Sequence, residues 1–211
     1  MPAESGHRWF AAFWDWMVRS ENGAVKSARH EVAGGARGRV VEVGCGNGAN
    51  FPYYGADATE LTAADPDPYM IQRAEKRAAQ IDRPIAVHRA PAEELPFPDA
   101  SFDTAVVTLV LCTVRDPAQA LAEIKRVLKP GGEMRFLEHV RFQNRIGGLC
   151  QDAITPIWSW MGGGCHPNRD TERALRQAGF TIRDLKTPVL EPPIPPMVCS
   201  RPVIQGVAVR T

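Results

Sequence analysis

The sequence has no excess of charge of either sign and no long apolar run. Its 211 residues include 25 basic and 24 acidic side chains, which gives a formal net charge of +1 at pH 7. Binding of nucleic acid through bulk charge needs clustered positive charge, so we expect no nucleic-acid partner. No apolar run approaches the roughly 20 residues that cross a bilayer, so we expect no transmembrane segment. The first residues lack the basic-then-apolar pattern of a secretory signal, which predicts a cytoplasmic protein.

Cysteine is scarce, and its spacing indicates no shared site. The five cysteines are Cys45, Cys112, Cys150, Cys165 and Cys199, and no Cys-x-x-Cys occurs. The odd number argues against a disulfide framework, and the absence of paired spacing argues against a structural zinc site. We therefore predict no metal. Cys45 and Cys112 are interpreted as small, buried apolar residues rather than as nucleophiles.

The most informative segment is residues 40–48, Val-Val-Glu-Val-Gly-Cys-Gly-Asn-Gly. Its first half is apolar and β-branched, as a buried parallel strand requires. Its glycines allow the backbone to approach a ligand closely, because glycine has no Cβ and can adopt positive φ. The next strand pattern closes on Asp65, about twenty residues further on, where an acid can accept hydrogen bonds from ribose hydroxyls. This combination predicts a nucleoside-containing cofactor.

Strand and helix patterns alternate along most of the chain, which predicts a parallel sheet with right-handed crossovers. We expect one α/β domain with a doubly wound, mostly parallel, seven-stranded sheet. The expected strands are residues 40–43, 60–65, 85–87, 102–111, 134–140, 180–185 and 203–209. The expected helices are residues 9–33 with a break at Gly23, then 68–81, 117–128 and 171–179, together with a helix opened by residues 47–54. Residues 92–99 read as a loop, the C-terminal third is less regular, and residues 188–202 are a proline-rich stretch.

These motifs resemble those of class I S-adenosylmethionine-dependent methyltransferases. The resemblance rests on residues 41–48, Asp65, residues 92–97 with Phe102-Asp103, and residues 126–132, in the family's order. Within that superfamily the chain is similar to the small thiol methyltransferases of the animal methyltransferase-like group, through residues 48–51, 65–66, 108–112, 138–140, 164–165, 169–170 and 201–202. Quinone and phospholipid methyltransferases share several of the same motifs.

The resemblance implies a Rossmann-like methyltransferase fold with an N-terminal aromatic helix. It also implies S-adenosylmethionine as cofactor, with S-adenosylhomocysteine as its product. On this basis residues 1–37 are a helical lid, 38–140 the cofactor-binding core and 141–211 the acceptor side. The animal relatives are held to membranes by an N-terminal apolar segment, so peripheral membrane contact stays open for this chain.

The resemblance also implies which residues hold the cofactor. The matching positions are Glu42, Gly44, Cys45, Gly46, Asn47, Gly48, Asp65, Pro66, Ala92, Glu93, Thr108 and Leu109. The glycine turn lies against the methionine part, and Asp65 accepts from both ribose hydroxyls. A loop-bracing ion pair is the alternative for Glu42, and a helix N-cap is the alternative for Asp65.

Acid–base candidates lie at the end of the expected fifth strand. A thiol acceptor must lose its proton, and its free pKa of about 8.5 makes that inexpensive. His139 and Glu138 are the predicted catalytic residues, with a structural hydrogen bond as the alternative for His139. His166, Arg169 and Asp170 form a second polar cluster, for which a structural role of His166 is the alternative. An apolar acceptor pocket is predicted from Phe13, Trp14, Met17 and Trp158.

The predicted function is methyl transfer from S-adenosylmethionine to a small, fairly apolar molecule, with sulfur as the first choice of accepting atom. Nitrogen or oxygen acceptors, including lipids, are the alternatives. A nicotinamide dehydrogenase would need Gly-x-Gly-x-x-Gly, whereas the glycines here are Gly44, Gly46 and Gly48. A binding module without catalysis is the non-enzymatic alternative. Arsenite methylation is disfavoured, because the scattered cysteines show no grouping for thiolate capture.

Overall fold

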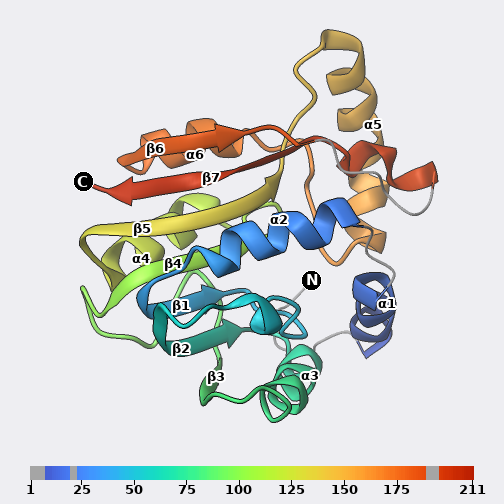
Figure 1. Ribbon diagram of the computed structural model, residues 1–211. Helices are drawn as coiled ribbons and strands as arrows, with labels where there is room; N and C mark the ends of the chain where they lie inside the picture. Colours follow the sequence, from blue (N-terminus) through green and yellow to red (C-terminus); the bar gives the residue numbers. More distant parts are fainter. Residues whose placement is uncertain (1–7, 20–22, 189–194) are drawn as a thin grey trace.

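A seven-stranded sheet forms the centre of the protein (Figure 1). The computed structural model describes residues 8–19, 23–188 and 195–211. The strands are β1 (Gly38–Val43), β2 (Ala58–Asp65), β3 (Ile85–Arg89), β4 (Phe102–Thr108), β5 (Leu128–His139), β6 (Phe180–Lys186) and β7 (Val203–Arg210). Their order is β3-β2-β1-β4-β5-β7-β6, and β7 runs antiparallel to both of its neighbours. The expected mostly parallel, seven-stranded sheet is confirmed.

Helices pack on both faces of the sheet, because successive side chains of a strand point to opposite faces. The helices are α1 (Arg8–Arg19), α2 (Gly23–Gly34), α3 (Pro68–Ala78), α4 (Pro117–Val127), α5 (Arg145–Met161) and α6 (Thr171–Gln177), with 3-10 turns η1 (Phe51–Tyr53) and η2 (Pro195–Ser200). Val41 belongs to the core that contains Leu121 of α4, whereas Val40 belongs to the core that contains Val32 of α2. Glu42, two residues after Val40, is therefore on the α2 face of the sheet.

The prediction of a helix that begins within residues 47–54 is wrong. This segment consists of turns and the short η1, held by bonds of the 3-10 type such as Gly48 N–H to Cys45 O and Tyr53 N–H to Asn50 O, each 2.9 Å. Gly48 has φ +74° and Pro52 lacks a backbone N–H, so an α-helix cannot extend through these residues. The chain instead turns tightly at the end of β1.

Helix α5 was not foreseen, and its burial pattern explains why. Its buried residues are Gly148, Gln151 and Thr155, while Ile157 and Trp160 are exposed. Apolar periodicity, the usual sign of a packed helix, is therefore missing from the side that faces the protein. Figure 1 shows α5 extending away from the end of the sheet. Within the described residues, the structure has no helix with the length and apolar character needed to cross a membrane.

Several element boundaries differ from those expected. The helical segment predicted over residues 9–33 with a break at Gly23 consists of two helices, and the second begins at Gly23. Strand β4 ends at Thr108 rather than at residue 111, because Leu109 has φ +59°, which is incompatible with an extended strand. Strand β5 starts at Leu128, earlier than expected. The other predicted strands and helices lie within a few residues of their observed bounds.

Candidate cofactor and acceptor site

The glycine loop after β1 is held against the end of β2. The backbone N–H groups of Gly44 and Cys45 both donate to the carbonyl of Ala64, at 2.8 and 3.0 Å. The loop glycines with positive φ are Gly44 (+68°), Gly46 (+54°) and Gly48 (+74°). A Cβ on Gly44 would lie 2.4 Å from the side chain of Val110, which is too close for any larger residue. The positive φ of Gly44 is also a backbone conformation that other residues rarely adopt.

Asp65, the last residue of β2, faces this loop. Its Oδ2 accepts a hydrogen bond from the N–H of Gly46, and its Oδ1 accepts one from the N–H of Asp67, both at 2.9 Å. The side chain is nearly buried. Burial raises the pKa of Asp65 to about 6, although the two N–H donors oppose the shift. The fold thus brings together the glycine turn and the distal acid that the sequence singled out.

Glu42 lies at the centre of a buried polar network. Its carboxylate accepts from the hydroxyl of Tyr54 at 2.7 Å and from Nδ2 of Asn50 at 3.0 Å. Asn50 also donates to Oγ1 of Thr108 at 3.1 Å and accepts from Arg29 at 3.0 Å. Burial raises the pKa of Glu42 to about 7, against the hydrogen bonds from Tyr54 and Asn50. The network joins β1, the glycine loop, β4 and α2.

Sequence reasoning missed three members of this network, Arg29, Asn50 and Tyr54. Asn50 and Tyr54 lie in the 47–54 segment, where a helix was expected, and Arg29 reaches Asn50 from α2. The available signal was Arg29 itself, an ionic residue within the apolar face of α2 formed by Ala28 and Val32. A buried cation on such a face requires a polar partner.

Helix α1 contacts the glycine loop. Asn47 donates through Nδ2 to Asp15 of α1 at 2.8 Å, and a Cβ placed on Gly46 would have Nε1 of Trp14 at 3.7 Å. The buried Oδ1 of Asn47 accepts no hydrogen bond from the described residues. The side chains of the predicted acceptor residues Phe13 and Met17 lie outside the described part of the structure.

The segment after β3 returns to the same place. The N–H of Ala90 donates to the carbonyl of Asp65 at 3.1 Å, and Nε of Arg89 donates to the carbonyl of Pro66 at 3.2 Å. Residues 90–93 therefore run beside the end of β2. Pro66 is half-buried at the edge of this junction.

Two further predicted cofactor residues, Ala92 and Glu93, continue this segment. Ala92 is buried in the core. The carboxylate of Glu93 accepts from the N–H groups of Arg115 and Asp116, at 2.9 and 3.3 Å, just before α4. The Glu93 side chain is thus occupied in holding the start of α4, and its backbone is the part that could contact a ligand.

Glu138 organises the turn that follows β4. It is fully buried, and it accepts hydrogen bonds from the N–H groups of Val110 (2.8 Å), Leu111 (3.0 Å) and Cys112 (3.2 Å). Burial raises its pKa, and the three N–H donors oppose the shift. With both oxygens engaged, Glu138 has the geometry of a positioning residue rather than that of a base that reaches an acceptor.

His139, Cys112 and Cys165 form a compact group beside Glu138. Nδ1 of His139 lies 3.5 Å from the sulfur of Cys112 and 3.5 Å from the sulfur of Cys165. All three side chains are buried or nearly so. Nothing in the sequence spacing indicated this group, because its members come from the turn after β4, the end of β5 and the segment after α5.

The remaining predicted acceptor residues border this group. The backbone N–H of His166 donates to the carbonyl of Cys112 at 2.6 Å, and its Nδ1 lies 2.7 Å from the carbonyl of Gly164. Arg169 donates to the carbonyl of Leu111, and burial lowers its pKa. The positive charge of Arg169 therefore lies next to the two cysteines.

Trp158 comes from α5. Its indole Nε1 is buried and has no hydrogen-bond partner among the described residues. The ring packs against Gly162, where a Cβ would lie 3.3 Å from Nε1. An unpartnered indole N–H is a donor that a bound ligand could satisfy.

Comparison with known proteins agrees with this geometry. The family model described as "Methyltransferase domain" matches residues 41–136. The thiol S-methyltransferase TMT1B of Rattus norvegicus is 37% identical over 177 residues, covering 81% of this chain and 70% of the rat protein. A phosphatidylethanolamine N-methyltransferase of Cereibacter sphaeroides is 32% identical over 172 residues, covering 74% of this chain and 83% of that protein.

A crystal structure of an S-adenosylmethionine-dependent methyltransferase from Thermotoga maritima has the same fold. It superposes with a TM-score of 0.68 at 20% identity, covering 95% of this chain and 94% of that one. The site described above also fits the cofactor of such enzymes. Its positive-φ glycines leave a cradle for a ligand, and the acceptors Asp65 and the unpartnered Oδ1 of Asn47 suit ribose hydroxyls and a cationic amino acid end, while Glu42, bonded to Tyr54 and Asn50, supports the loop. The chain belongs to the class I S-adenosylmethionine-dependent methyltransferases, in the group that includes the thiol S-methyltransferases, and S-adenosylmethionine is its cofactor.

Proposed function

We propose that this enzyme transfers the methyl group of S-adenosylmethionine to the thiol of a small, fairly apolar molecule. The main support is the extent of the similarity to the rat thiol S-methyltransferase. That similarity spans 177 residues, far more than the residues 41–136 matched by the general methyltransferase domain. It therefore extends beyond residues 38–140, which we assign to the cofactor, into chain that we assign to the acceptor.

On the cofactor side, we assign each predicted residue a role that its position supports. The carboxylate of Asp65 accepts from the ribose hydroxyls, and the 44–48 loop lies against the methionine part. Glu42 orients the loop and, with Asn47, the amino group. The backbone at Ala92 and Glu93 contacts the adenine edge.

Two further contacts complete this side. Pro66 lines the adenine slot beside the backbone of residues 90–93. The carbonyls of Thr108 and Leu109 face the amino acid end, from the carboxyl edge of β4 where open α/β sheets bind ligands.

On the acceptor side, the proposed roles are mainly of contact and positioning. His139 contacts the acceptor, and Glu138 holds the turn of residues 110–112 that lines the site. The cation of Arg169 favours the thiolate form of an acceptor nearby. Trp158 and the helix α1 residues Phe13, Trp14 and Met17 form the apolar walls of the acceptor pocket. His166 holds the segment after α5 in place beside that pocket.

Methyl transfer requires little of these residues beyond alignment of the acceptor. The cofactor supplies a methyl group that is already activated. The residues of the chain bind and orient the acceptor sulfur and exclude water around it. A thiol with a pKa of about 8.5 is partly ionised near neutral pH, so a dedicated base is not required.

A turnover assay tests the proposal. The purified enzyme is incubated with S-adenosylmethionine and matched panels of small apolar thiols, amines and phenols, and S-adenosylhomocysteine is measured. We expect product with thiols above all. Product with amines or phenols but not thiols would contradict the thiol assignment, and binding of the cofactor without product from any acceptor would identify a binding module instead.

A lipid or nitrogen acceptor is the second candidate. The similarity to the phosphatidylethanolamine N-methyltransferase favours it, since that protein too is matched over most of its length. Adding phosphatidylethanolamine vesicles to the same assay separates the two: methylated lipid with no methylated thiol would establish this candidate.

A further inference from the structure

We propose that Cys112, His139 and Cys165 form a binding site for a thiophilic divalent cation, of which Zn²⁺ is the best fit. Among the described residues, these are the one group of three metal-ligating side chains whose donor atoms converge, all within 4.8 Å of one another. The donors are two sulfurs and one imidazole nitrogen, a set that zinc binds in many proteins. This inference does not depend on methyl transfer.

The spacing of the donors matches tetrahedral coordination. With Zn–S near 2.3 Å and Zn–N near 2.0–2.1 Å, tetrahedral angles place a sulfur and a nitrogen ligand about 3.5 Å apart. Nδ1 of His139 lies 3.5 Å from each of the two sulfurs. A cation between the three atoms would therefore need little movement of the side chains.

The backbone fixes each ligand in place. Glu138 accepts from the N–H of Cys112 at 3.2 Å and so holds the turn that carries this cysteine. The N–H of His166 donates to the carbonyl of Cys112 at 2.6 Å, which ties the segment of Cys165 to the same turn. His139 ends β5 and is adjacent to Glu138 in the sequence. Preorganised ligands of this kind reduce the cost of metal binding.

The surrounding charges are compatible with a dication. Two thiolates and a neutral imidazole would balance the ion, and the opposite charges of Glu138 and Arg169 beside the group offset each other. Cys112 and Cys165 are free cysteines, and a neutral thiol gives up its proton when it binds zinc. Zinc ligation displaces such protons, which makes the affinity fall at low pH.

Three protein ligands leave one position of a tetrahedral ion for water or another ligand.

The alternatives to a metal site are a hydrogen-bonded thiol and imidazole group, and a disulfide between the two cysteines. Each predicts a different outcome of the same experiment.

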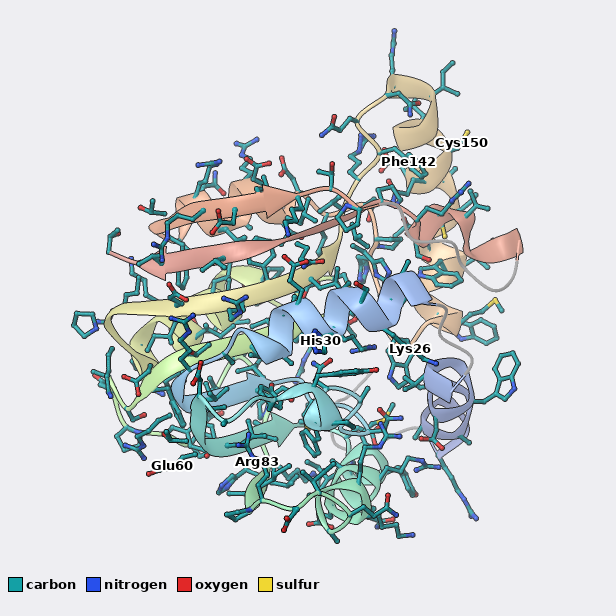
Figure 2. The ribbon with its side chains drawn as sticks, viewed as in Figure 1. Lys26, His30, Glu60, Arg83, Phe142 and Cys150 are labelled. Carbon is teal, nitrogen blue, oxygen red and sulfur yellow. The ribbon has the colours of Figure 1, made fainter. Side chains whose placement is uncertain are left out.

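Zinc titration of the reduced, chelator-treated full chain is the test, with a chromophoric chelator as competitor. We expect one tightly bound Zn²⁺ per chain, and an affinity at least about 100-fold weaker in Cys112→Ser and Cys165→Ser. The matched control is Cys150→Ser, since Cys150 is exposed on α5 (Figure 2) and should bind zinc like the unchanged chain. Absorption of the Co²⁺ form of the unchanged chain adds a readout that needs no variant: tetrahedral thiolate ligation gives intense visible and near-ultraviolet bands.

Equal zinc affinity in Cys112→Ser, Cys165→Ser and the control would overturn the proposal. So would the absence of stoichiometric zinc and of thiolate–cobalt bands in the unchanged chain. A Cys112–Cys165 disulfide found by mass spectrometry in protein purified without reductant, with no zinc bound after reduction, would also overturn it in favour of a redox pair. Circular dichroism checks that each serine variant is folded before its affinity is read.

Discussion

The carboxylate of Asp65 accepts a hydrogen bond from the backbone N–H of Gly46, with 2.9 Å between Oδ2 and N. This contact joins the end of β2 to the glycine loop. The acid that we assign to the ribose is therefore held next to the loop that we assign to the methionine part. Most of the expected outcomes below follow from this junction.

Replacing Asp65 with Asn should weaken S-adenosylmethionine binding by roughly 10–100-fold. The substitution removes the negative charge from the acceptor of two hydroxyl hydrogen bonds, and bonds to charged groups contribute about 1.5–3 kcal/mol. Isothermal titration calorimetry measures the change. The control is Asp103→Asn, because Asp103 lies at the other end of the sheet, paired with Lys129. An unchanged affinity in Asp65→Asn would contradict the assigned role.

Cofactor affinity should fall as the pH is lowered through about 6. The pKa of Asp65 is raised to about 6, and only its ionised form is a full acceptor for the ribose hydroxyls. The contribution of Asp65 to the affinity should therefore be level above this pH and decrease below it. Titrations from pH 5 to 8 check the profile. The Asp65→Asn variant should show a flatter profile between pH 5 and 7, and an equally steep one would assign the titration to another group.

The variant Glu42→Gln should alter how stability depends on pH. Burial raises the pKa of Glu42 in the folded state to about 7, above its ordinary value of 4.5. The folded state then binds more protons than the unfolded state between these values, so this group's contribution to stability is lost as the pH rises through 7. Between pH 6 and 7, the free energy of unfolding should fall by about 1 kcal/mol more in the unchanged chain than in the variant.

Urea unfolding of the enzyme without cofactor, at matched pH values, measures that difference. Asp65 titrates at lower pH and is common to both proteins, as are the histidines, so the difference isolates Glu42. Parallel stability curves above pH 6 would show that Glu42 is ionised throughout this range.

A pair of glycine variants separates backbone strain from loss of the ligand cradle. Gly46 (φ +54°) and Gly131 (φ +74°) both have left-handed backbone, and a Cβ at either would meet no atom closer than 3.7 Å. Gly46→Ala and Gly131→Ala should each lose about 1 kcal/mol of stability. Only Gly46→Ala should also weaken cofactor binding, by about 10-fold or more, because its methyl group enters the cradle. Equal cofactor affinities would contradict close approach at Gly46.

The attachment of α5 should depend on one buried amide. Gln151 is fully buried, and its Nε2 donates to the carbonyls of Val140, Pro167 and Cys199 while its Oε1 accepts from the N–H of Phe142. Gln151→Ala leaves these groups without partners and should cost about 3 kcal/mol in urea unfolding. The control on the same helix is Ile157→Ala, an exposed position that should change stability by less than about 0.5 kcal/mol. Similar losses in both would contradict this account.

The sheet could be predicted because the residues of each central strand show the apolar pattern of a buried strand. Residues 40–43 and 102–108 are apolar and β-branched since both faces of a central parallel strand are buried. Helix α5 could not be predicted in this way, because Gln151 and Thr155 face the protein while its apolar side chains are exposed. The helix predicted from residues 47–54 was wrong for a related reason: side chains of this segment form hydrogen bonds in the network around Glu42 and do not pack as a helix would.

The candidate site was only partly visible in the sequence. The motifs placed Glu42 and Asp65 at the ends of neighbouring strands, and the fold brings both to the glycine loop. The contacts of Arg29 with Asn50 depend on tertiary packing and leave no local pattern. Cys112 and Cys165 lie 27 and 26 positions from His139 in the sequence. Such separations predict no contact, and the three residues come together only because the fold places the turn after β4, the end of β5 and the segment after α5 side by side. The lid and acceptor roles of the N-terminal helix stay predictions.

The place of β7 affects how the chain folds during synthesis. This strand is the last of the seven described strands in chain order, yet it lies between β5 and β6 and pairs with both. Until the ribosome has added residues 203–210, one long edge of β5 therefore has no partner, and unpaired edges attract other chains. A chain that ends before residue 203 should be a target for chaperones and proteases, whereas a chain that includes β7 can close the sheet.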